Sequence, residues 1–156
     1  MMLAQALAVA AAVLSQGADG LVTLRLAAVR VHVPAAWEHK VDQGTHRFNA
    51  PSGDAYFLLD TGKTAQRMDA NVCLQKVTQQ LGGDWTKLSI AAAPAARRFE
   101  LVHNDQTQSD VHEYTYVGCD GATTWSLILR IDGKKHDRYA PLGEKVAQSI
   151  EYIRDL

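Results

Sequence analysis

The segment from Val29 to Asp60 constrains the fold more than any other part of the chain, because its residue pattern changes from strand to turn and back. Within it, the valines of Val29–Val33 alternate with polar residues, which is the period-two pattern of a half-buried strand. Pro34 cannot donate a hydrogen bond to a sheet, so it ends this strand. We expect Trp37 to pack as an anchor at the corner that follows.

Two more strands are expected in the same segment, at Thr45–Asn49 and Ala55–Thr61. The turn between them, Ala50–Asp54, carries a proline followed two residues later by a glycine, which is typical of a tight turn. The run Tyr56–Leu59 is apolar throughout and predicts a strand covered on both faces. The segment therefore predicts a compact module that opens on an antiparallel sheet.

The middle of the chain carries the clearest helical period, at Ala65–Leu81. Thr64 is the expected N-cap, and the glycine pair after Leu81 is the expected stop. Trp85–Ile90 alternates as a strand, whereas Ala91–Ala96 contains a proline and is expected to be a connector.

The second half of the chain predicts an antiparallel meander that ends in a helix. β-Branched and aromatic residues are enriched in three strand-length segments: Arg97–His103, Val111–Val117 and Thr123–Ile131. A turn at Gly118–Gly121 joins the last two, and the charged turn Asp132–Arg138 should be solvated. The final helix is expected to start at Pro141, with an apolar stripe spaced by four, four and three residues: Leu142, Val146, Ile150 and Ile153.

This order of elements predicts an α+β fold, with an antiparallel sheet of about six or seven strands sandwiched by helices. The chain has 156 residues, which is a usual length for one domain. A domain of this size buries roughly two-thirds of its unfolded surface, so it can build its own core. We expect residues 19–156 to form a single domain.

The first 18 residues contain no charged side chain. Their apolar run, Leu3–Leu14, is twelve residues long, whereas a membrane-spanning helix needs about twenty. Small residues follow at Ser15, Gly17 and Ala18, as before a signal-peptidase cleavage site, although no basic residue precedes the run. We expect residues 1–18 to be a signal peptide and the exported protein to have no stable membrane insertion; an alanine-rich helix packed on the domain is the alternative.

The chain has two cysteines, Cys73 and Cys119. An even count after an export signal favours a disulfide. The bond would close a loop of about 45 residues and stabilise the fold by about 4 kcal/mol in the loop-entropy account. Two separate buried thiols, which behave as small hydrophobic groups, are the alternative.

The charges nearly cancel, with 16 Lys and Arg against 17 Asp and Glu. A nucleic-acid-binding domain usually carries a clear basic excess, so we expect no nucleic-acid partner. The basic clusters are Arg97–Arg98 and Lys134–His136. Each is either a solvated loop or a contact for an acidic partner.

With this order of elements, the chain resembles the PsbP-like superfamily. The matching features are the strand that ends in Val33-Pro34-Ala35-Ala36-Trp37 and the turn Phe48–Gly53, together with a helix, a long meander and a closing helix. The resemblance covers about residues 22–156 and implies a central antiparallel sheet sandwiched by helices. The group includes an extrinsic photosystem II subunit, a Ran-GTPase-binding import factor and small exported bacterial proteins. It has no shared catalytic residues, so the resemblance implies no site residue here.

The sequence contains no zinc-helix, nucleophile-elbow, phosphate-loop, dinucleotide or C-x-x-C motif, and no cofactor or metal is predicted. His39 and His46 flank one polar turn and could gather with His32 on one edge, but no histidine spacing matches a standard metal site. The remaining histidines are His103, His112 and His136.

Two other residue pairs carry groups that could serve catalysis. Cys119 and His112 resemble a nucleophile and its base, but they would lie about 20 Å apart along one strand. Asp54 and Asp60 resemble a carboxylate pair, but they are better explained as a turn residue and a strand end. The sequence therefore predicts no catalytic residue.

Three functions remain open. The first is a non-catalytic exported accessory protein that binds a protein partner, in the cell envelope or outside the cell, through an exposed edge or face of its sheet. The second is a carrier of a small molecule or lipid in a cleft of roughly 300 Å³ or more between sheet and helix. The third is a hydrolase with a dispersed site.

Overall fold

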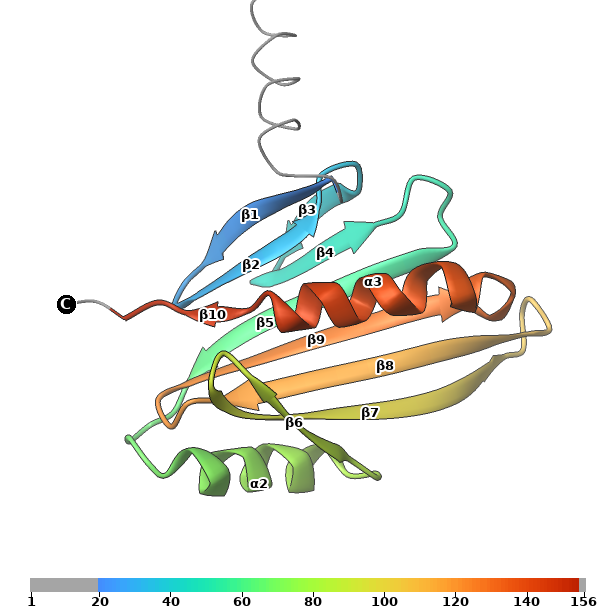
Figure 1. The fold of residues 1–156 in the computed structure, drawn as a ribbon. Helices are drawn as coiled ribbons and strands as arrows, with labels where there is room; N and C mark the ends of the chain where they lie inside the picture. The colour runs from blue at the N-terminus through green and yellow to red at the C-terminus, as the bar shows by residue number, and fades with distance from the viewer. Residues whose placement is uncertain (1–19, 155–156) are drawn as a thin grey trace, which may run out of the picture.

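The computed structural model describes residues 20–154, which form two antiparallel sheets and two α-helices (Figure 1). The larger sheet has seven strands in the order β3-β4-β5-β9-β8-β7-β6, and the smaller has three in the order β1-β2-β10. The strands are β1 (Leu21–Leu26), β2 (Val29–Pro34), β3 (Glu38–Asp42), β4 (Thr45–Asn49), β5 (Ala55–Lys63), β6 (Thr86–Ile90), β7 (Ala93–Asn104), β8 (Ser109–Cys119), β9 (Thr123–Asp132) and β10 (Glu151–Tyr152). The helices are α2 (Ala70–Leu81) and α3 (His136–Gln148), the latter preceded by the 3₁₀ turn η1 (Gly133–Lys135). The expected signal peptide lies outside the described residues.

Strict alternation along β9 gives the larger sheet one apolar face. Trp125, Leu127, Leu129 and Ile131 are at most 2% exposed, and the residues between them point to the other side of the sheet. The register aligns this row with neighbouring strands, because Leu129 lies opposite both Phe57 of β5 and Tyr114 of β8. The main core therefore lies on this face.

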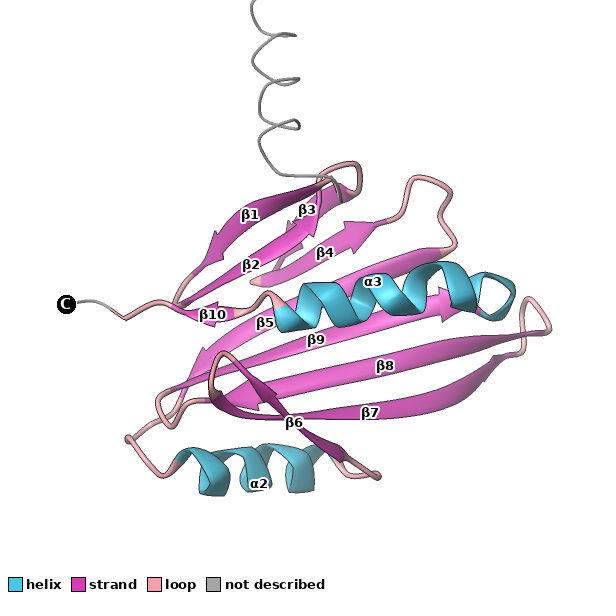
Figure 2. Cartoon of the chain, viewed as in Figure 1, coloured by secondary structure: helices cyan, strands magenta, loops and turns pink. Residues whose placement is uncertain are grey.

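Helix α3 and the smaller sheet cover the apolar face together (Figures 1 and 2). Val146 and Ala147 of α3 are fully buried, and the three valines of Val29–Val33 in β2 join the same core. Trp37 stacks on Phe57 with ring centroids 4.7 Å apart, so the corner tryptophan is the expected anchor.

Helix α2 lies on the opposite face and covers only one end of it. Leu74 packs against Ala96 of β7 and Val117 of β8, whose side chains point away from the main core. A disulfide joins Cys73 to Cys119, with the Cα atoms 6.1 Å apart. The rest of this face has no covering element among the described residues, and we call it the open face.

The fold class is as predicted: α+β, with an antiparallel sheet between helices on its two faces. The expected double coverage of Tyr56–Leu59 is wrong. Phe57 and Leu59 are fully buried, but Tyr56 and Leu58 are only half-buried on the open face, because α2 does not reach them.

The first helix is shorter than predicted. It begins at Ala70, and its N-cap is Asp69, whose carboxylate accepts hydrogen bonds from the backbone N–H groups of Asn71 and Val72. The expected cap, Thr64, instead binds the β8–β9 turn, where its N–H donates to Ala122 O at 2.9 Å. The stop after Leu81 is as predicted.

The expected connector at Ala91–Ala96 is also wrong, because β7 begins at Ala93. The turn is made by Ala91 and Ala92 alone, both with positive φ (56° and 57°). Pro94 is tolerated in the strand since pairing with β8 starts only at Ala95, which leaves Pro94 with a single neighbouring strand.

The final helix starts five residues before the predicted Pro141, and this proline lies inside it. Much of the turn expected to be solvated, Asp132–Arg138, is therefore helical. Ile150 is buried in the core but follows the helix, on the way into β10.

Removing the disulfide tests how strongly α2 depends on it. The Cys73→Ala, Cys119→Ala double variant should lose about 4 kcal/mol of unfolding free energy, because its unfolded chain regains the entropy of the open loop. Urea unfolding measures this loss. Equal stability of the two proteins, with both thiols of the wild type alkylated before any reduction, would contradict the bond.

Candidate functional site

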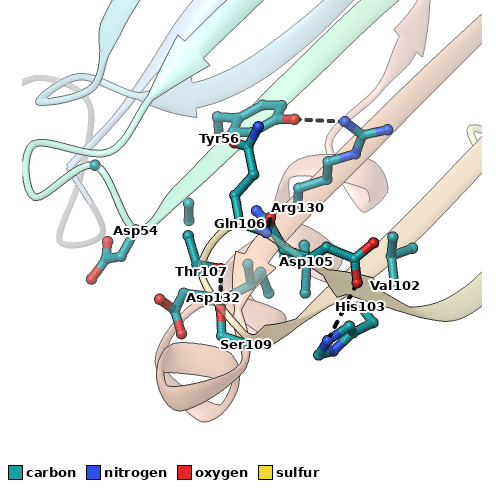
Figure 3. A pocket seen from close by; sticks show the side chains of 15 residues that line it. Asp54, Tyr56, Val102, His103, Asp105, Gln106, Thr107, Ser109, Arg130 and Asp132 are labelled. Atoms are coloured by element: carbon teal, nitrogen blue, oxygen red, sulfur yellow. Dashed lines mark hydrogen bonds and ion pairs between the residues drawn. The ribbon is translucent and has the colours of Figure 1, made fainter.

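A pocket lies at one end of the larger sheet, between the β4–β5 turn and the β7–β8 turn (Figure 3). Its volume is about 680 Å³. Tyr56, Val102, Val111 and Arg130 line it from the open face of the sheet, and the β7–β8 turn adds polar groups such as Gln106. The pocket is thus an extension of the open face.

Arg130 is held in place at this pocket by two partners on neighbouring strands. Its Nε donates to Glu113 Oε2 of β8 at 2.6 Å, and its Nη1 donates to Tyr56 Oη of β5 at 2.8 Å. Glu113 is only 8% exposed, so the ion pair compensates a nearly buried carboxylate. Burial acts to lower the pKa of Arg130, but the hydrogen bonds that it donates to Glu113 and Tyr56 outweigh this effect and raise that pKa.

A second guanidinium extends this arrangement toward the β3 edge. The Cζ atom of Arg47 lies 3.9 Å from the centroid of the Tyr56 ring, within cation–π range. Arg47 also donates from Nε to Asn49 Oδ1 at 2.8 Å. Tyr56 is therefore contacted by both arginines, and the three side chains form a fixed polar surface across β4, β5 and β9.

The β4–β5 turn contributes a carboxylate at the other side of the pocket. Asp54 Oδ1 accepts hydrogen bonds from Ser52 Oγ at 2.6 Å and Tyr139 Oη at 2.7 Å, and these bonds hold its pKa below the usual value. The backbone carbonyl of Asp54 also accepts from Asp132 N, which ties the turn to the end of β9. This wall is thus rigid and ionised at neutral pH.

The arrangement is suited to recognition. It offers fixed guanidinium, carboxylate, phenol and amide groups at the mouth of an open pocket. Among the described lining residues, no hydroxyl is hydrogen-bonded to a histidine, because Thr107 and Ser109 bond to each other and Tyr56 bonds to Arg130. Residues 20–154 contain no group of three or more His, Cys, Asp or Glu side chains that could hold a metal.

The structure brings four of the six histidines together in two pairs. His39 Nε2 lies 2.9 Å from His46 Nδ1, and the rings of His112 and His136 have centroids 4.3 Å apart. The expectation that His32 joins His39 and His46 is wrong, because His32 belongs to the smaller sheet. His103 lies beside the carboxylates of Asp105 and Asp110.

The other candidate pairs are kept apart. Cys119 is in the disulfide and lies at the far end of β8 from His112. Asp54 and Asp60 have different partners, since Asp60 accepts from Thr45 Oγ1 at 2.7 Å on the adjacent strand.

The basic clusters are also dispersed. Arg97 reaches Glu144 of α3 at 3.4 Å, whereas Arg98 points to the opposite face and donates to Gly82 O at 2.7 Å, at the end of α2. Lys134 and Lys135 lie in η1.

The Arg130 arrangement is not among the features predicted from the sequence. A charged residue between Leu129 and Ile131 marks the solvent side of a strand, and that signal is visible in the sequence. The partners are not visible, because Glu113 and Tyr56 meet Arg130 only through the registers of β8 and β5 with β9.

No family model matches the chain, and no curated protein sequence does either. Solved structures with the same fold do match. One is the cyanobacterial PsbP protein (CyanoP) of Synechocystis sp. PCC 6803, 11% identical, covering 87% of this chain and 94% of that protein, with a TM-score of 0.59. Another is LpqN of Mycobacterium tuberculosis, described as involved in cell envelope biogenesis, 13% identical over 81% of this chain and 83% of LpqN, with a TM-score of 0.58.

The Ran-binding protein Mog1p of Saccharomyces cerevisiae is also similar, at 11% identity over 87% of this chain and 97% of Mog1p, with a TM-score of 0.53. A protein from Bacteroides thetaiotaomicron gives a TM-score of 0.66 at 12% identity and matches over 81% of this chain, which spans only 46% of its length. These structures confirm that the chain has the PsbP-like fold, and at such identities they establish the fold alone.

Removing the guanidinium tests whether it holds the open face together. Arg130→Met leaves Glu113 nearly buried without its cation, so we expect a loss of about 2 kcal/mol in unfolding free energy. Arg25→Met, at an exposed position on β1, should change it by less than about 0.5 kcal/mol. Equal effects of the two variants in urea unfolding would show that the pair contributes nothing.

The His112–His136 contact predicts a pH dependence of stability. Burial and then the nearby His136 hold the pKa of His112 below the ordinary 6.5, against the opposing pull of Asp110 and Asp137. Its Nδ1 is buried and has no hydrogen-bond partner among the described residues. As pH falls, His112 is therefore protonated in the unfolded chain at a higher pH than in the folded protein.

The stabilising contribution of neutral His112 should be complete above about pH 6.5 and should be lost as pH falls through the lower folded pKa. Urea unfolding at a series of pH values between 8 and 5, together with an NMR titration of the ring, measures this in wild type and in His112→Phe. A ring that titrates at or above 6.5, or an identical acid slope in the variant, would contradict the prediction.

Proposed function

We propose that this protein is a non-catalytic, exported accessory protein whose open sheet face binds a protein partner in the cell envelope or outside the cell. The observation that carries the proposal is the open face itself, where Arg130, Tyr56 and Arg47 are held in fixed positions beside a 680 Å³ pocket. Tyrosine and arginine are among the residue types most enriched in binding hot spots, and pre-positioned side chains lose little entropy on binding.

Export is supported by the uncharged, apolar start of the sequence and by the Cys73–Cys119 disulfide, since disulfides persist in oxidising compartments. None of the helices that the structure describes between residues 20 and 154 has the length and apolar character needed to span a membrane. The similar fold of LpqN, described as involved in cell envelope biogenesis, and of the Ran-binding protein Mog1p supports an accessory role by analogy.

A carrier of a small molecule is the second candidate, because a cleft of about 310 Å³ lies between α2 and the sheet. Val77 and Leu81 of α2 and Val117 of β8 contribute apolar groups to it, but Asp60, Thr124 and Ser126 also line it. The ring of Trp125 is buried on the other face of the sheet, so this cleft offers a ligand few apolar groups beside a polar wall, and it fits an apolar ligand poorly. Native mass spectrometry that finds a co-purified small molecule would favour the carrier.

A hydrolase is the third candidate and has the least support. The open pocket does gather polar groups, but the serine and threonine hydroxyls among its described lining residues, Thr107 and Ser109, hydrogen-bond to each other and not to a base.

Site-specific photo-cross-linking in the source cell tests the proposed function. A photoreactive phenylalanine analogue replaces Tyr56 on the open face or, as a control, the exposed Gln148 of α3. We expect a discrete heavier adduct from position 56 only, and an intact mass that lacks the first 18 or so residues. Absence of any adduct from position 56, in a protein that is folded and abundant, would reject a partner at the open face.

A further inference from the structure

One border of the larger sheet is only half paired. Strand β6 pairs with β7 from Ala93 to Arg97, and from Arg98 to Asn104 β7 has a strand partner only on the β8 side among the described residues. In Figure 2, the half of β7 near the β7–β8 turn forms the border of the sheet, with no ribbon beyond it. The backbone groups that point outward there have no sheet partner.

This border is also the most apolar exposed part of the described chain. Six large apolar side chains are exposed in residues 20–154, and three of them lie in a stretch of four residues on β7. Their exposed fractions are 46% for Phe99, 54% for Leu101 and 42% for Val102. Phe99 and Leu101 point to the α3 side, where Phe99 contacts the rings of Tyr114 and His112. Exposed apolar groups beside unpaired backbone are what a strand-binding site requires.

Another border of the same sheet is protected. Strand β3 has five residues, three of them charged: Glu38, Lys40 and Asp42. Short, charged edge strands are the usual protection against pairing with other chains. The free part of β7 lacks this protection, since Arg98 donates back to Leu81 O and Gly82 O and leaves Glu100 as its other charged residue.

A second copy of this chain does not fit the edge. In antiparallel pairing centred on Leu101, Arg97 of one copy comes opposite Asp105 of the other. Arg97 already pairs with Thr86 of its own β6, so β6 would occupy the space of the other copy's β7–β8 turn. Shifting the pairing of the two copies toward the β7–β8 turn avoids this overlap, but only about 17 Å of paired strand would then join them. So short a contact buries little surface, whereas stable interfaces bury about 1,200–2,000 Å².

We propose that the free edge of β7 binds an extended segment of the protein partner, which adds to the sheet as one more antiparallel strand. Such a segment is one strand wide, so it passes beside the β7–β8 turn without meeting β6. It needs about five residues, with apolar side chains at alternate positions next to Phe99 and Leu101 and polar side chains between them, next to Glu100. This inference rests on the proposed partner-binding function and identifies the kind of partner.

The test uses an eight-residue peptide in which valine and threonine alternate, closed by two lysines for solubility. It is titrated into the ¹⁵N-labelled protein and followed by NMR and amide hydrogen exchange. We expect saturable shifts that centre on Phe99–His103, with slower exchange of the outward amides of that stretch. Shifts that centre on the pocket or on α2, or no shifts at all, would overturn the inference.

Two variants and two modified peptides sharpen the result. Leu101→Lys places a charge on the free edge and should weaken binding about tenfold or more, whereas Val41→Lys, at a similarly exposed position on β3, should not. One modified peptide is N-methylated at its valines and the other at its threonines, so the two lose amide donors on opposite sides of the strand. Only one side pairs with β7, so strand pairing predicts that only one of the two modified peptides loses binding. Equal loss in both, or in neither, would contradict strand addition.

Failure here is distinguishable from failure of the proposed function. If position 56 cross-links a partner in cells while the peptide leaves β7 unchanged, the partner-binding function stands and the edge proposal is wrong. If the peptide pairs with β7 and position 56 forms no adduct, the edge binds strands but the open face is not the partner's surface.

Discussion

The structure depends on the register that aligns β9 between β5 and β8. Because the side-chain period of a strand is two, a slip of one residue would send Trp125, Leu127 and Leu129 to the open face and Arg130 into the core. The buried row provides the surface on which α3 and the smaller sheet pack. Gly118 adds to this constraint, since a Cβ atom at that position would lie 2.4 Å from the ring of Trp125, which covers it from the neighbouring strand.

The same register explains why the two faces of the sheet differ in chemical character. Arg130 alternates with the buried row along β9 and so points to the open face. Glu113 points to the same face from β8, and the two meet only because they are directly opposite each other. Helix α2, tied by the disulfide to the end of β8, covers one end of this face and leaves the other end exposed. The pocket, the arginine–tyrosine arrangement and the free part of β7 all lie toward that exposed end. The proposed binding surfaces and the main hydrophobic core therefore occupy different parts of one sheet.

The parts of the fold that depend on local periodicity could be predicted from the sequence, and those that depend on long-range partners could not. The alternation of Val29–Val33 and of β9 is a local signal, and both strands are as expected. The predicted start of α2 is wrong because Thr64, the expected cap, instead contacts Ala122 of the β8–β9 turn, and this long-range contact is not visible in the sequence. Pro94 predicts a break between strands, because proline cannot donate to a sheet. The sequence does not show that β7 has only one neighbouring strand at Pro94, which is why the proline is tolerated there. The Arg130 site was missed for the same reason: its three members are far apart in sequence and meet only through strand pairing.

The most direct measurement is native-state amide hydrogen exchange of the isolated protein, read residue by residue along β7 and β8. A sheet that leaves one border open for contact predicts slow exchange for the paired amides of β8 and alternating fast and slow exchange across Phe99–His103, where every second amide points away from β8. Uniformly slow exchange across Phe99–His103 would show that this border is already covered in the free protein and would contradict the account.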